Sequence, residues 1–463
     1  MIVMSTASTP HRLLLILIYC IYCLLATMYA VLVPPWEAPD EPAHYRYVSE
    51  LASRWRPAVN SGIRQKASFA KDYDFISSNY EWTYPALGYV PAALAYATIH
   101  ALAPQSLPTN IPPQNTRYSQ DSKQLNLFLH PNNRVWDVWY GNEGLLAIRI
   151  FLALWGLGVL YATTRVGNLL DSSGLLAVVA SGLVAFLPQF TFINASVRSD
   201  TITNVVAGFT LLLAVQLQFR PNQINRSALV LGILIGAGTL CKYTFLFILP
   251  IAIIAIPLSQ PRFPTSWTKP LFCMLIPFAI LIGAYYLSFE EARIALAYTL
   301  NNSLTPKSAA FFWEHLGLAL ELFFITLFYA GFGWANVIPP AAWARLALGA
   351  WLIGTIITLV QAFKWIKIQN SPAALRAIVL LTLSLLFAIT GVFGLNLSQF
   401  QPQGRFLFPT LVAWAIVCLW GAWQILSLRG KIILGISSVG FMLAFNLYAI
   451  FFTLIPAYYH GIP

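Results

Sequence analysis

Residues 13–33 read LLLILIYCIYCLLATMYAVLV, and the residues that follow, 34–45, read PPWEAPDEPAHY. The first stretch is about 21 residues long and uncharged, so as a helix it crosses the roughly 30 Å hydrocarbon layer of a bilayer. It is longer than the ~7–15-residue apolar core of a cleaved signal peptide, the competing interpretation, and we expect a retained anchor. Because the whole chain is 58% hydrophobic and only 9% charged, the composition predicts an all-α polytopic membrane protein.

Further apolar stretches bring the predicted number of transmembrane helices to about 11. They are residues 145–164, 174–190, 202–219, 227–241, 243–258, 270–287, 342–363, 377–396, 406–427 and 432–454. Two more apolar stretches, 84–103 and 316–335, are interrupted by proline, or by an acidic residue and glycines. We expect these two to lie in the outer interface without crossing the bilayer.

Lysine and arginine gather in the short links between the predicted spans, and the positive-inside rule assigns these links to the cytoplasm. Membrane topology and anionic headgroups thus account for the net charge of +11, and we expect no nucleic-acid partner. Residues 34–143 then form one large extracytoplasmic loop, which holds ten of the sixteen acidic residues. We expect residues 1–463 to form a single integral-membrane domain.

Asp40 and Glu41 lie side by side a few residues after the first span. Pro42 suits the first turn of a helix, which would place His44 and Tyr45 one turn further on. The carboxylates could ligate a metal, or one could act as general base while its neighbour or His44 tunes it. Alternatively, Asp40 caps the helix and Glu41 interacts with its dipole. On this motif alone both interpretations stay open.

Three more charged residues stand at span boundaries on the outer side. Asp200 could cap a helix, but two outward acidic sites next to helix ends can also converge on one cavity. Arg405 has the planar fork that binds phosphate through two charge-assisted bonds, although it could also snorkel to the headgroups. Lys242 interrupts two apolar runs, and its expected partner is an anionic headgroup or a phosphate.

Aromatic residues near the first loop could stack on a sugar ring or belong to an interfacial belt. These residues are Trp36, Tyr45, Trp82, Tyr84 and Tyr89. The chain has no P-loop and no H-E-x-x-H motif, so nucleotide-driven transport and zinc proteolysis have no support.

Taken together, these motifs resemble the GT-C superfamily of integral-membrane glycosyltransferases, which use polyprenyl-phosphate-linked sugars, and most of all its aminoarabinose-transferase and protein O-mannosyltransferase types. The Asp-Glu pair that opens the first outer loop in that superfamily is matched by Asp40 and Glu41. Its acid in the second outer loop is matched by Asp200, its Pro-rich aromatic segment by residues 84–89, and its Gly-Arg-aromatic motif by residues 404–406. The aminoarabinose transferases usually place a lysine before a double proline, where this chain has residues 81–84 before a single proline, so that lysine's donor contacts cannot be carried over.

The resemblance implies transfer of a sugar from a polyprenyl-phosphate donor to a lipid, glycan or protein acceptor at the extracytoplasmic face of the plasma (inner) membrane. The expected catalytic residues are Asp40, Glu41 and Asp200, and the expected substrate-binding residues are His44, Tyr45, Tyr84, Tyr89, Lys242 and Arg405. Asp40 and Asp200 are the candidate ligands of an Mg²⁺ or Mn²⁺ ion, while metal-free base catalysis stays open. The alternative from another class is a transporter or flippase of lipid-linked glycans that makes no bond.

Overall fold

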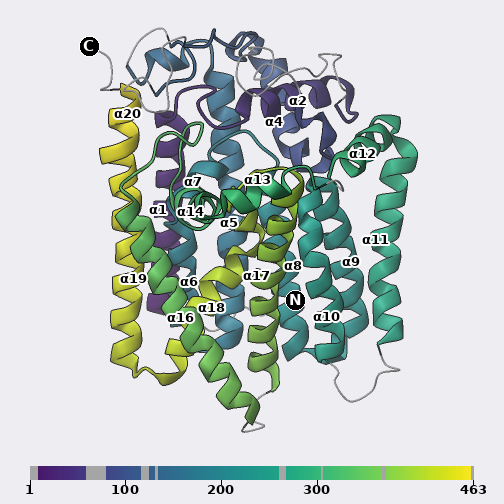
Figure 1. The fold of residues 1–463 in the computed structure, drawn as a ribbon, viewed down its shortest axis with the longest axis vertical. Coiled ribbons are helices and arrows are strands. Elements are labelled where there is room, and N and C mark those ends of the chain that lie inside the picture. Colours follow the sequence, from purple (N-terminus) through teal and green to yellow (C-terminus); the bar gives the residue numbers. More distant parts are fainter. Residues whose placement is uncertain are drawn as a thin grey trace.

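The computed structural model describes residues 9–58, 80–115, 125–130, 134–259, 267–303, 306–367 and 372–459. Over these residues the secondary structure is helical and contains no β-strand. Nine helices of this part of the chain are long and apolar enough to cross a membrane, and Figure 1 shows them running side by side in one direction. The predicted all-α, multi-pass membrane protein is therefore confirmed.

Each of the nine spans contains one long α-helix; the fourth also includes the 3₁₀-helix η5 (Pro221–Gln223) before α9, and the last two include short helical extensions. The long helices are α1 (Thr9–Leu32), α5 (Glu143–Leu170), α8 (Asp200–Phe219), α9 (Ile224–Cys241), α11 (Thr268–Ser288), α16 (Ala341–Lys367), α17 (Pro372–Ser398), α18 (Leu411–Ile425) and α19 (Leu428–Tyr448). The extensions are η9 (Gly404–Thr410) before α18, and η10 (Ala449–Leu454) with α20 (Ile455–Tyr459) after α19.

The predicted number of about 11 spans differs from this set at two places. The predicted span 174–190 is a pair of helices, α6 (Leu175–Ala185) and α7 (Pro188–Asn194), that are bent by 66° relative to one another. Pro188 has no N–H to continue α6 and keeps Leu187 extended at ψ 112°, so the helix breaks there. The predicted span 243–258 begins as the 3₁₀-helix η6 (Tyr243–Ile248) and continues as the short α10 (Leu249–Ser259), which together fall below the length of the nine spans.

The two stretches that we expected not to cross are short helices. The first is α4 (Val90–Leu102), whose 13 residues extend about 20 Å at 1.5 Å per residue. The second is divided into α14 (Leu316–Glu321), the π-helix η8 (Leu322–Thr326) and α15 (Leu327–Tyr329). In Figure 1, α4 lies at the upper end of the molecule beside α2 (Glu41–Arg54), and α14 is seen end-on, across the direction of the long helices.

The span formed by η9 and α18 runs through the middle of the bundle, and 94% of its most apolar 18-residue stretch is buried. It approaches α16 closely because glycines face the contact: a Cβ on Gly421 would lie 2.4 Å from the backbone of Thr358. The Thr358 hydroxyl donates to the carbonyl of Val417 at 2.6 Å and accepts from the N–H of Gly421 at 2.7 Å. Small residues and short polar contacts of this kind are what joins helices in a membrane.

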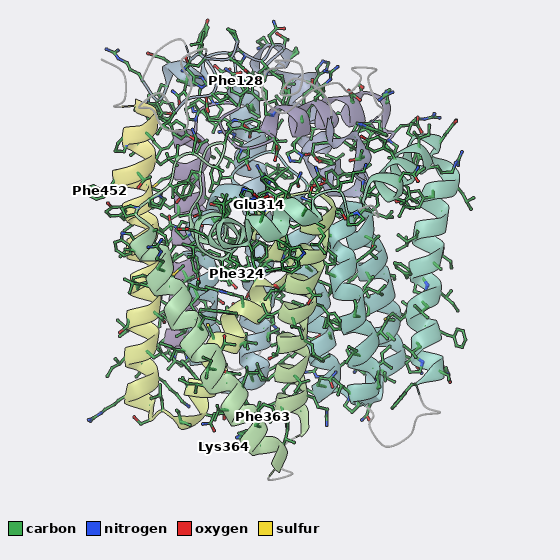
Figure 2. All side chains as sticks on the ribbon, viewed as in Figure 1. Phe128, Glu314, Phe324, Phe363, Lys364 and Phe452 are labelled. Carbon is green, nitrogen blue, oxygen red and sulfur yellow. The ribbon has the colours of Figure 1, made fainter. Side chains whose placement is uncertain are left out.

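The two ends of the bundle differ in chemistry. The lower ends of α10, α11, α16 and α17 and the connection between α18 and α19 lie at the lower end in Figure 1, and Figure 2 shows Lys364 there. The side chains of Phe363 and Phe452 are 67% and 70% exposed, respectively, as expected for helix faces that meet lipid. The acidic segment after α1 lies at the opposite, upper end together with α2, α4 and α12 (Glu290–Ser303).

Candidate functional site

Asp40 lies in the turn between α1 and α2. Its φ is +64°, and its side chain makes no capping hydrogen bond to α2. Instead, one of its carboxylate oxygens accepts a hydrogen bond from the Arg405 guanidinium at 2.9 Å. Positive φ is uncommon outside glycine, and strained residues of this kind concentrate at functional sites. One of the two interpretations from the sequence was that the Asp40 side chain caps the helix. The structure shows no such capping hydrogen bond.

Arg405 belongs to η9, where the backbone passes close to the segment 323–328. A Cβ on the preceding Gly404 would lie 2.2 Å from the carbonyl oxygen of Phe323, so only glycine permits this approach. The close approach holds η9 deep in the protein, and only 8% of the Arg405 side chain is exposed. The Gly-Arg pair of the sequence motif thus has a physical basis: the glycine allows the approach that buries the arginine.

A second ion pair joins the start of α8 to the end of α9. Lys242 Nζ lies 2.8 Å from Asp200 Oδ1, and the two side chains are 4% and 8% exposed, respectively. The same ammonium stands 5.3 Å from the ring centres of both Tyr84 and Phe406, a cation–π arrangement. Because Phe406 follows Arg405 in η9, this pair adjoins the Asp40–Arg405 pair.

Arg198, in the link between α7 and α8, is a third cation of the site and is fully buried. It donates to the Ser196 hydroxyl at 2.8 Å and to the carbonyl of Pro39 at 2.6 Å. Burial, followed by the positive charge of Arg405, lowers the pKa of Arg198 to about 10. With Arg405 and Lys242, Arg198 gives the site three buried basic side chains, which suit an anion.

Several buried polar atoms of this site lack a hydrogen-bond partner among the residues that the structure describes. They are Arg405 Nε, Arg198 Nη1 and Asp200 Oδ2. Buried polar atoms are nearly always hydrogen-bonded in native proteins, and an unpaired one costs free energy. Three such atoms on charged groups of one cluster are available to bond with a ligand or with water. We call Asp40, Arg198, Asp200, Lys242 and Arg405 the open cluster.

The open cluster borders a cavity of about 140 Å³. Asp40 and Arg405 both line it, together with Gln189, Gln403 and Trp334. The Gln189 side chain accepts from the N–H of Gly331 at 2.6 Å and so holds the segment after α15 against this cavity. The carboxylate and the guanidinium can thus both contact a molecule that enters the cavity.

Below the cavity, apolar openings follow η9 and α18 into the bundle. A small one is lined by Phe328, Leu407 and Trp414. It shares Trp351 and Trp414 with a groove of about 590 Å³ that is bounded by side chains of α6, α16, α18 and α19. The groove reaches α18 at Trp414, nine residues after Arg405 in the chain, and an apolar groove in the span region suits a hydrocarbon tail.

His44 and Glu81 form the other wall of the charged site. His44 Nδ1 lies 2.7 Å from the Tyr89 hydroxyl and 3.8 Å from a Glu81 carboxylate oxygen. Burial, and then the charge of Arg198, lowers the pKa of His44 well below its usual value, so the imidazole is neutral at pH 7. Burial, and then the negative charge of Asp40, raises the pKa of Glu81 to about 8. A buried carboxyl with a shifted pKa beside other charged groups is typical of a functional site.

Asp40, His44 and Glu81 could together hold a cation, because each offers one ligand atom and these atoms lie within 4.8 Å of one another. Two carboxylates and an imidazole are donors that Mn²⁺ accepts, and further oxygens from substrate or water would suit Mg²⁺. The predicted metal pair was Asp40 with Asp200, but Asp200 is not part of this group. Its Oδ1 is instead engaged by Lys242, which the sequence could not reveal.

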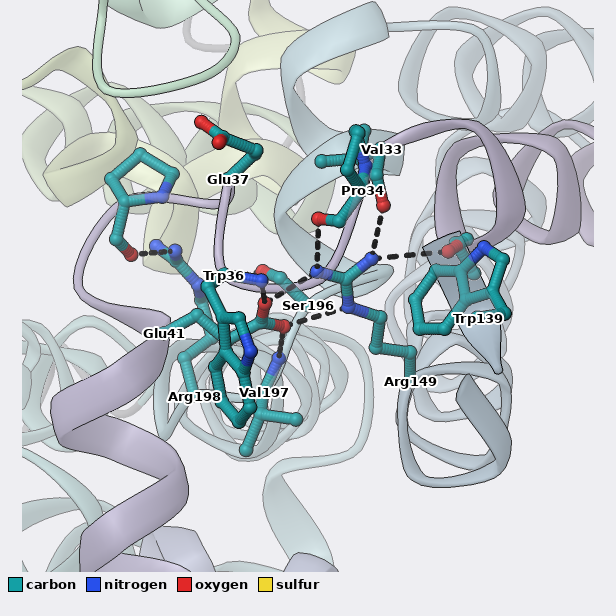
Figure 3. Close-up of polar contacts among 12 residues, drawn as sticks. Val33, Pro34, Trp36, Glu37, Glu41, Trp139, Arg149, Ser196, Val197 and Arg198 are labelled. Atoms are coloured by element: carbon teal, nitrogen blue, oxygen red, sulfur yellow. Dashed lines mark hydrogen bonds and ion pairs between the residues drawn. The ribbon is translucent and has the colours of Figure 1, made fainter. Parts of the chain in front are cut away.

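Glu41, the neighbour of Asp40, lies in a different ionic cluster, shown in Figure 3. Arg149, from α5, donates to both carboxylate oxygens of Glu41, and neither side chain is exposed to solvent. Both groups are also bonded to backbone: Glu41 to the N–H groups of Trp36 and Val197, and Arg149 to the carbonyls of Ala30, Val33 and Pro34. We call Glu41 and Arg149 the sealed cluster.

The structure brings most of the predicted site residues together. Those that meet around the charged site are Asp40, His44, Tyr84, Tyr89, Asp200, Lys242 and Arg405. Glu41 points into the sealed cluster, and Tyr45 packs between Trp36 and Tyr96 and donates to the carbonyl of Pro108.

Two residues of the charged site, Glu81 and Arg198, were not predicted. Arg198 precedes Asp200 by two residues, so a cation beside a predicted site acid was a signal that could have been used. Glu81 lies at the position where the sequence departs from the family pattern, so the resemblance gave no reason to include it among the site residues. Its contact with His44 joins segments 37 residues apart in the chain, and no local pattern reports such a contact.

The chain resembles a known protein in structure only. No protein-family model and no curated protein matches the chain. Among solved structures, the chain is similar to the oligosaccharyltransferase of Archaeoglobus fulgidus in complex with Zn and sulfate, with a TM-score of 0.42 and 13% sequence identity. The match covers 96% of this chain and 52% of the archaeal one, so the chain spans about half the length of that protein. A likeness of this size carries no weight for activity, which has to be argued from the site.

Proposed function

We propose that this protein is a glycosyltransferase of the GT-C type, which moves a sugar from a polyprenyl-phosphate donor to an acceptor at the extracytoplasmic face of the plasma membrane. One observation carries the proposal: Asp40 and Arg405 share a cavity close to two further buried basic side chains, Arg198 and Lys242, and an apolar groove lies along α18, the helix that follows Arg405. The carboxylate suits a general base, the cations suit a phosphate, and the groove suits a lipid tail.

In the proposed reaction a hydroxyl or amine of the acceptor attacks the anomeric carbon of the donor sugar. The new glycosidic bond forms as the bond between that carbon and the phosphate oxygen breaks, so the electron pair leaves with polyprenyl phosphate. Asp40 takes the proton from the acceptor. Attack from the side opposite the phosphate inverts the configuration at the anomeric carbon.

Negative charge grows on the phosphate as it leaves, and the cations of the open cluster lie where they can stabilise it. Arg405 has an unpaired buried Nε, and Arg198 an unpaired buried Nη1, within the described residues. Donors that are fixed in place before the reaction, in a site with little water, contribute most to such stabilisation. Lys242 is held over Tyr84 and Phe406 and adds a third positive charge.

Asp200 serves in this scheme to hold Lys242 in position, through the contact of 2.8 Å. Glu41 serves to fix the turn that carries Asp40, because both of its oxygens are bonded to Arg149 and to backbone N–H groups. We therefore assign Glu41 to positioning and keep Asp40 as the group that contacts the acceptor.

The donor set of Asp40, His44 and Glu81 fits a divalent cation. When bound, such an ion would neutralise negative charge on the donor phosphate. His44 would offer a neutral imidazole, while Glu81 would first have to lose its proton.

The orientation of the site follows from the distribution of charge. Lys364, near the end of α16, lies at the end of the bundle opposite the segment between α1 and α2 that carries Asp40 (Figure 1 and Figure 2). The positive-inside rule assigns the basic end to the cytoplasm, so the open cluster faces the extracytoplasmic side.

The test is to incubate the purified protein in lipid nanodiscs with a polyprenyl phosphate that carries a radiolabelled sugar, and with an extract of cell-envelope glycolipids as acceptor. We expect the label to move to the acceptor and free polyprenyl phosphate to appear, and Arg405→Ala to abolish both while the protein still folds. A transporter or flippase would move the labelled lipid between leaflets of a vesicle with its sugar–phosphate bond intact. That outcome would overturn the proposal.

A further inference from the structure

A second cavity lies on the outer side of α2, and none of the proposed chemistry uses it. We call it the outer cleft. It has a volume of about 710 Å³ and lies between α2, α4 and the segment 104–111. Ligand sites commonly have volumes of ~300–1,000 Å³, so the outer cleft is large enough for several sugar rings.

The walls of the outer cleft combine aromatic faces with hydrogen-bonding groups. Trp36, Tyr45 and Tyr96 contact one another edge to face, with ring centres 5.1 and 5.7 Å apart, and His100 stacks on Tyr96. Ser49, Thr109 and Asn110 also line the cleft. Sugars present apolar C–H faces and a rim of hydroxyls, so rings and short polar side chains in one cleft suit them.

Trp36 supplies an independent sign that a ligand belongs here. Its indole is 1% exposed, and its Nε1 has no hydrogen-bond partner in the part of the chain that the structure describes. Its φ is +72°, a conformation that a bulky residue adopts only under constraint. The indole N–H is enclosed in this structure, so a ligand hydroxyl in the cleft that Trp36 lines could accept its hydrogen bond only after a small movement of the wall.

The charge of the outer cleft favours a neutral ligand. Its cation Arg46 lies 3.5 Å from Glu50, one turn further along α2. Among the residues that the structure describes, the lining of the cleft therefore lacks the concentration of buried cations that marks the open cluster, to which we assign the donor phosphate.

The outer cleft also adjoins the charged cavity. The carbonyl of Trp36 accepts a hydrogen bond from Trp334 Nε1 at 3.2 Å, and Trp334 lines the cavity of Asp40 and Arg405. We propose that the outer cleft binds a neutral saccharide portion of the acceptor, so that the acceptor of this enzyme is a glycan or a glycolipid. That the bound saccharide belongs to the acceptor rests on the proposed function. Saccharide binding by the cleft does not depend on it.

The test is saturation-transfer NMR of the protein in nanodiscs with methyl glycosides and trisaccharides of neutral hexoses. We expect binding of at least one of these probes, weakened about two- to tenfold in Tyr96→Ala and in Asn110→Ala. Leu94→Ala, which removes an exposed side chain of α4 that does not line the cleft, is the matched control and should bind like the wild type. In the transfer assay Tyr96→Ala should raise the KM for the acceptor and leave kcat unchanged.

Failure of this inference can be told apart from failure of the proposed function. Asp40→Asn should lose transfer and keep saccharide binding. A wild-type protein that binds the probes but transfers no sugar would refute the transferase and leave the saccharide cleft standing. The cleft proposal is overturned if no saccharide binds, if Tyr96→Ala binds as well as the wild type, or if a proline-rich peptide binds in place of the sugars.

Discussion

The open cluster and the sealed cluster begin at adjacent residues, Asp40 and Glu41, yet their environments are opposite. In the sealed cluster Arg149 donates to both oxygens of Glu41, and backbone groups complete the bonding on both sides. In the open cluster Arg405 touches Asp40 through one nitrogen and leaves its buried Nε without a partner among the described residues. Both arginines are at least nine-tenths buried, so burial alone does not separate them.

The difference teaches that unpaired atoms, more than buried charge, distinguish a binding site from a structural ion pair. A buried pair with every bond made has no capacity left for a ligand. The sealed cluster still matters for the site, because it ties α1, α2 and α5 together around the turn that gives Asp40 its positive φ. The open cluster thus depends on the sealed cluster for its geometry, and the comparison can be tested from both sides.

The largest effect is expected for Asp40→Asn, which keeps the shape of the side chain and removes its charge. Sugar transfer should fall by about 10²–10⁴-fold, the usual contribution of a general base. The thermal midpoint of unfolding should fall less than in Glu41→Gln, because Asp40 is 23% exposed, whereas Glu41 is fully buried, and the amide oxygen can keep the hydrogen bond to Arg405. Initial rates of label transfer and a thermal-shift assay on the same preparation measure both. A variant that transfers sugar at the wild-type rate would remove Asp40 from the mechanism.

Glu41→Gln should act in the opposite way, on stability. It leaves the buried Arg149 guanidinium without its counter-charge, and breaking a buried ion pair in this way costs about 3–5 kcal/mol. We expect a large fall in the thermal midpoint in detergent. Glu50→Gln on the same helix is the matched control, because its partners Arg46 and Arg54 are exposed and such pairs contribute about 0–1 kcal/mol. Equal midpoints for the two variants would contradict the role given to the sealed cluster.

Arg405→Lys tests whether the open cluster needs a guanidinium or only a positive charge. Lysine keeps the charge but loses the planar fork, including the unpaired Nε that we assign to the donor phosphate. Catalytic efficiency should fall by about 10- to 100-fold, as expected for one lost charge-assisted bond of ~1.5–3 kcal/mol. The effect should appear with the polyprenyl-phosphate donor and not as a change in acceptor KM. An unaltered donor dependence would reduce Arg405 to a source of charge.

The sequence predicted the elements of this comparison better than their pairing. Uncharged stretches such as residues 13–33 decide the membrane fold, because hydrocarbon thickness sets helix length. The short helices α6, α7 and α10 were harder to predict, since their apolar stretches resemble complete spans. Charged residues at span ends directed attention to Asp40, Asp200, Lys242 and Arg405.

The separation of Asp40 from Glu41 could not be predicted, because it depends on contacts between distant segments. Arg149 reaches Glu41 across 108 positions of the chain, and Arg405 reaches Asp40 across 365. Arg149 lies inside a predicted span, where hydropathy alone counts it as a minor interruption. Only the packing of α5 against the turn after α1 turns it into the partner of Glu41.

The smallest effect is a dependence of stability on pH, and it concerns Glu81, which borders the open cluster. Burial, and then the charge of Asp40, raises the pKa of Glu81 to about 8 from an ordinary value near 4.5, with Lys242, Asp200 and Arg405 also acting on it. Between these values the folded protein holds a proton that the unfolded chain has lost, so the free energy of unfolding falls as pH rises and levels off above about 8.

From pH 6.5 to 8 the fall should amount to as much as about 2 kcal/mol, since each pH unit is worth at most ~1.36 kcal/mol. His44 is neutral in the folded protein across this window, because its pKa lies below the usual value, and its titration in the unfolded chain is common to the wild type and Glu81→Gln. On going from pH 6.5 to 8 the thermal midpoint should therefore fall more in the wild type than in Glu81→Gln. If Glu81→Gln keeps the same pH slope, the proton belongs to another group and Glu81 is ionised in the folded protein.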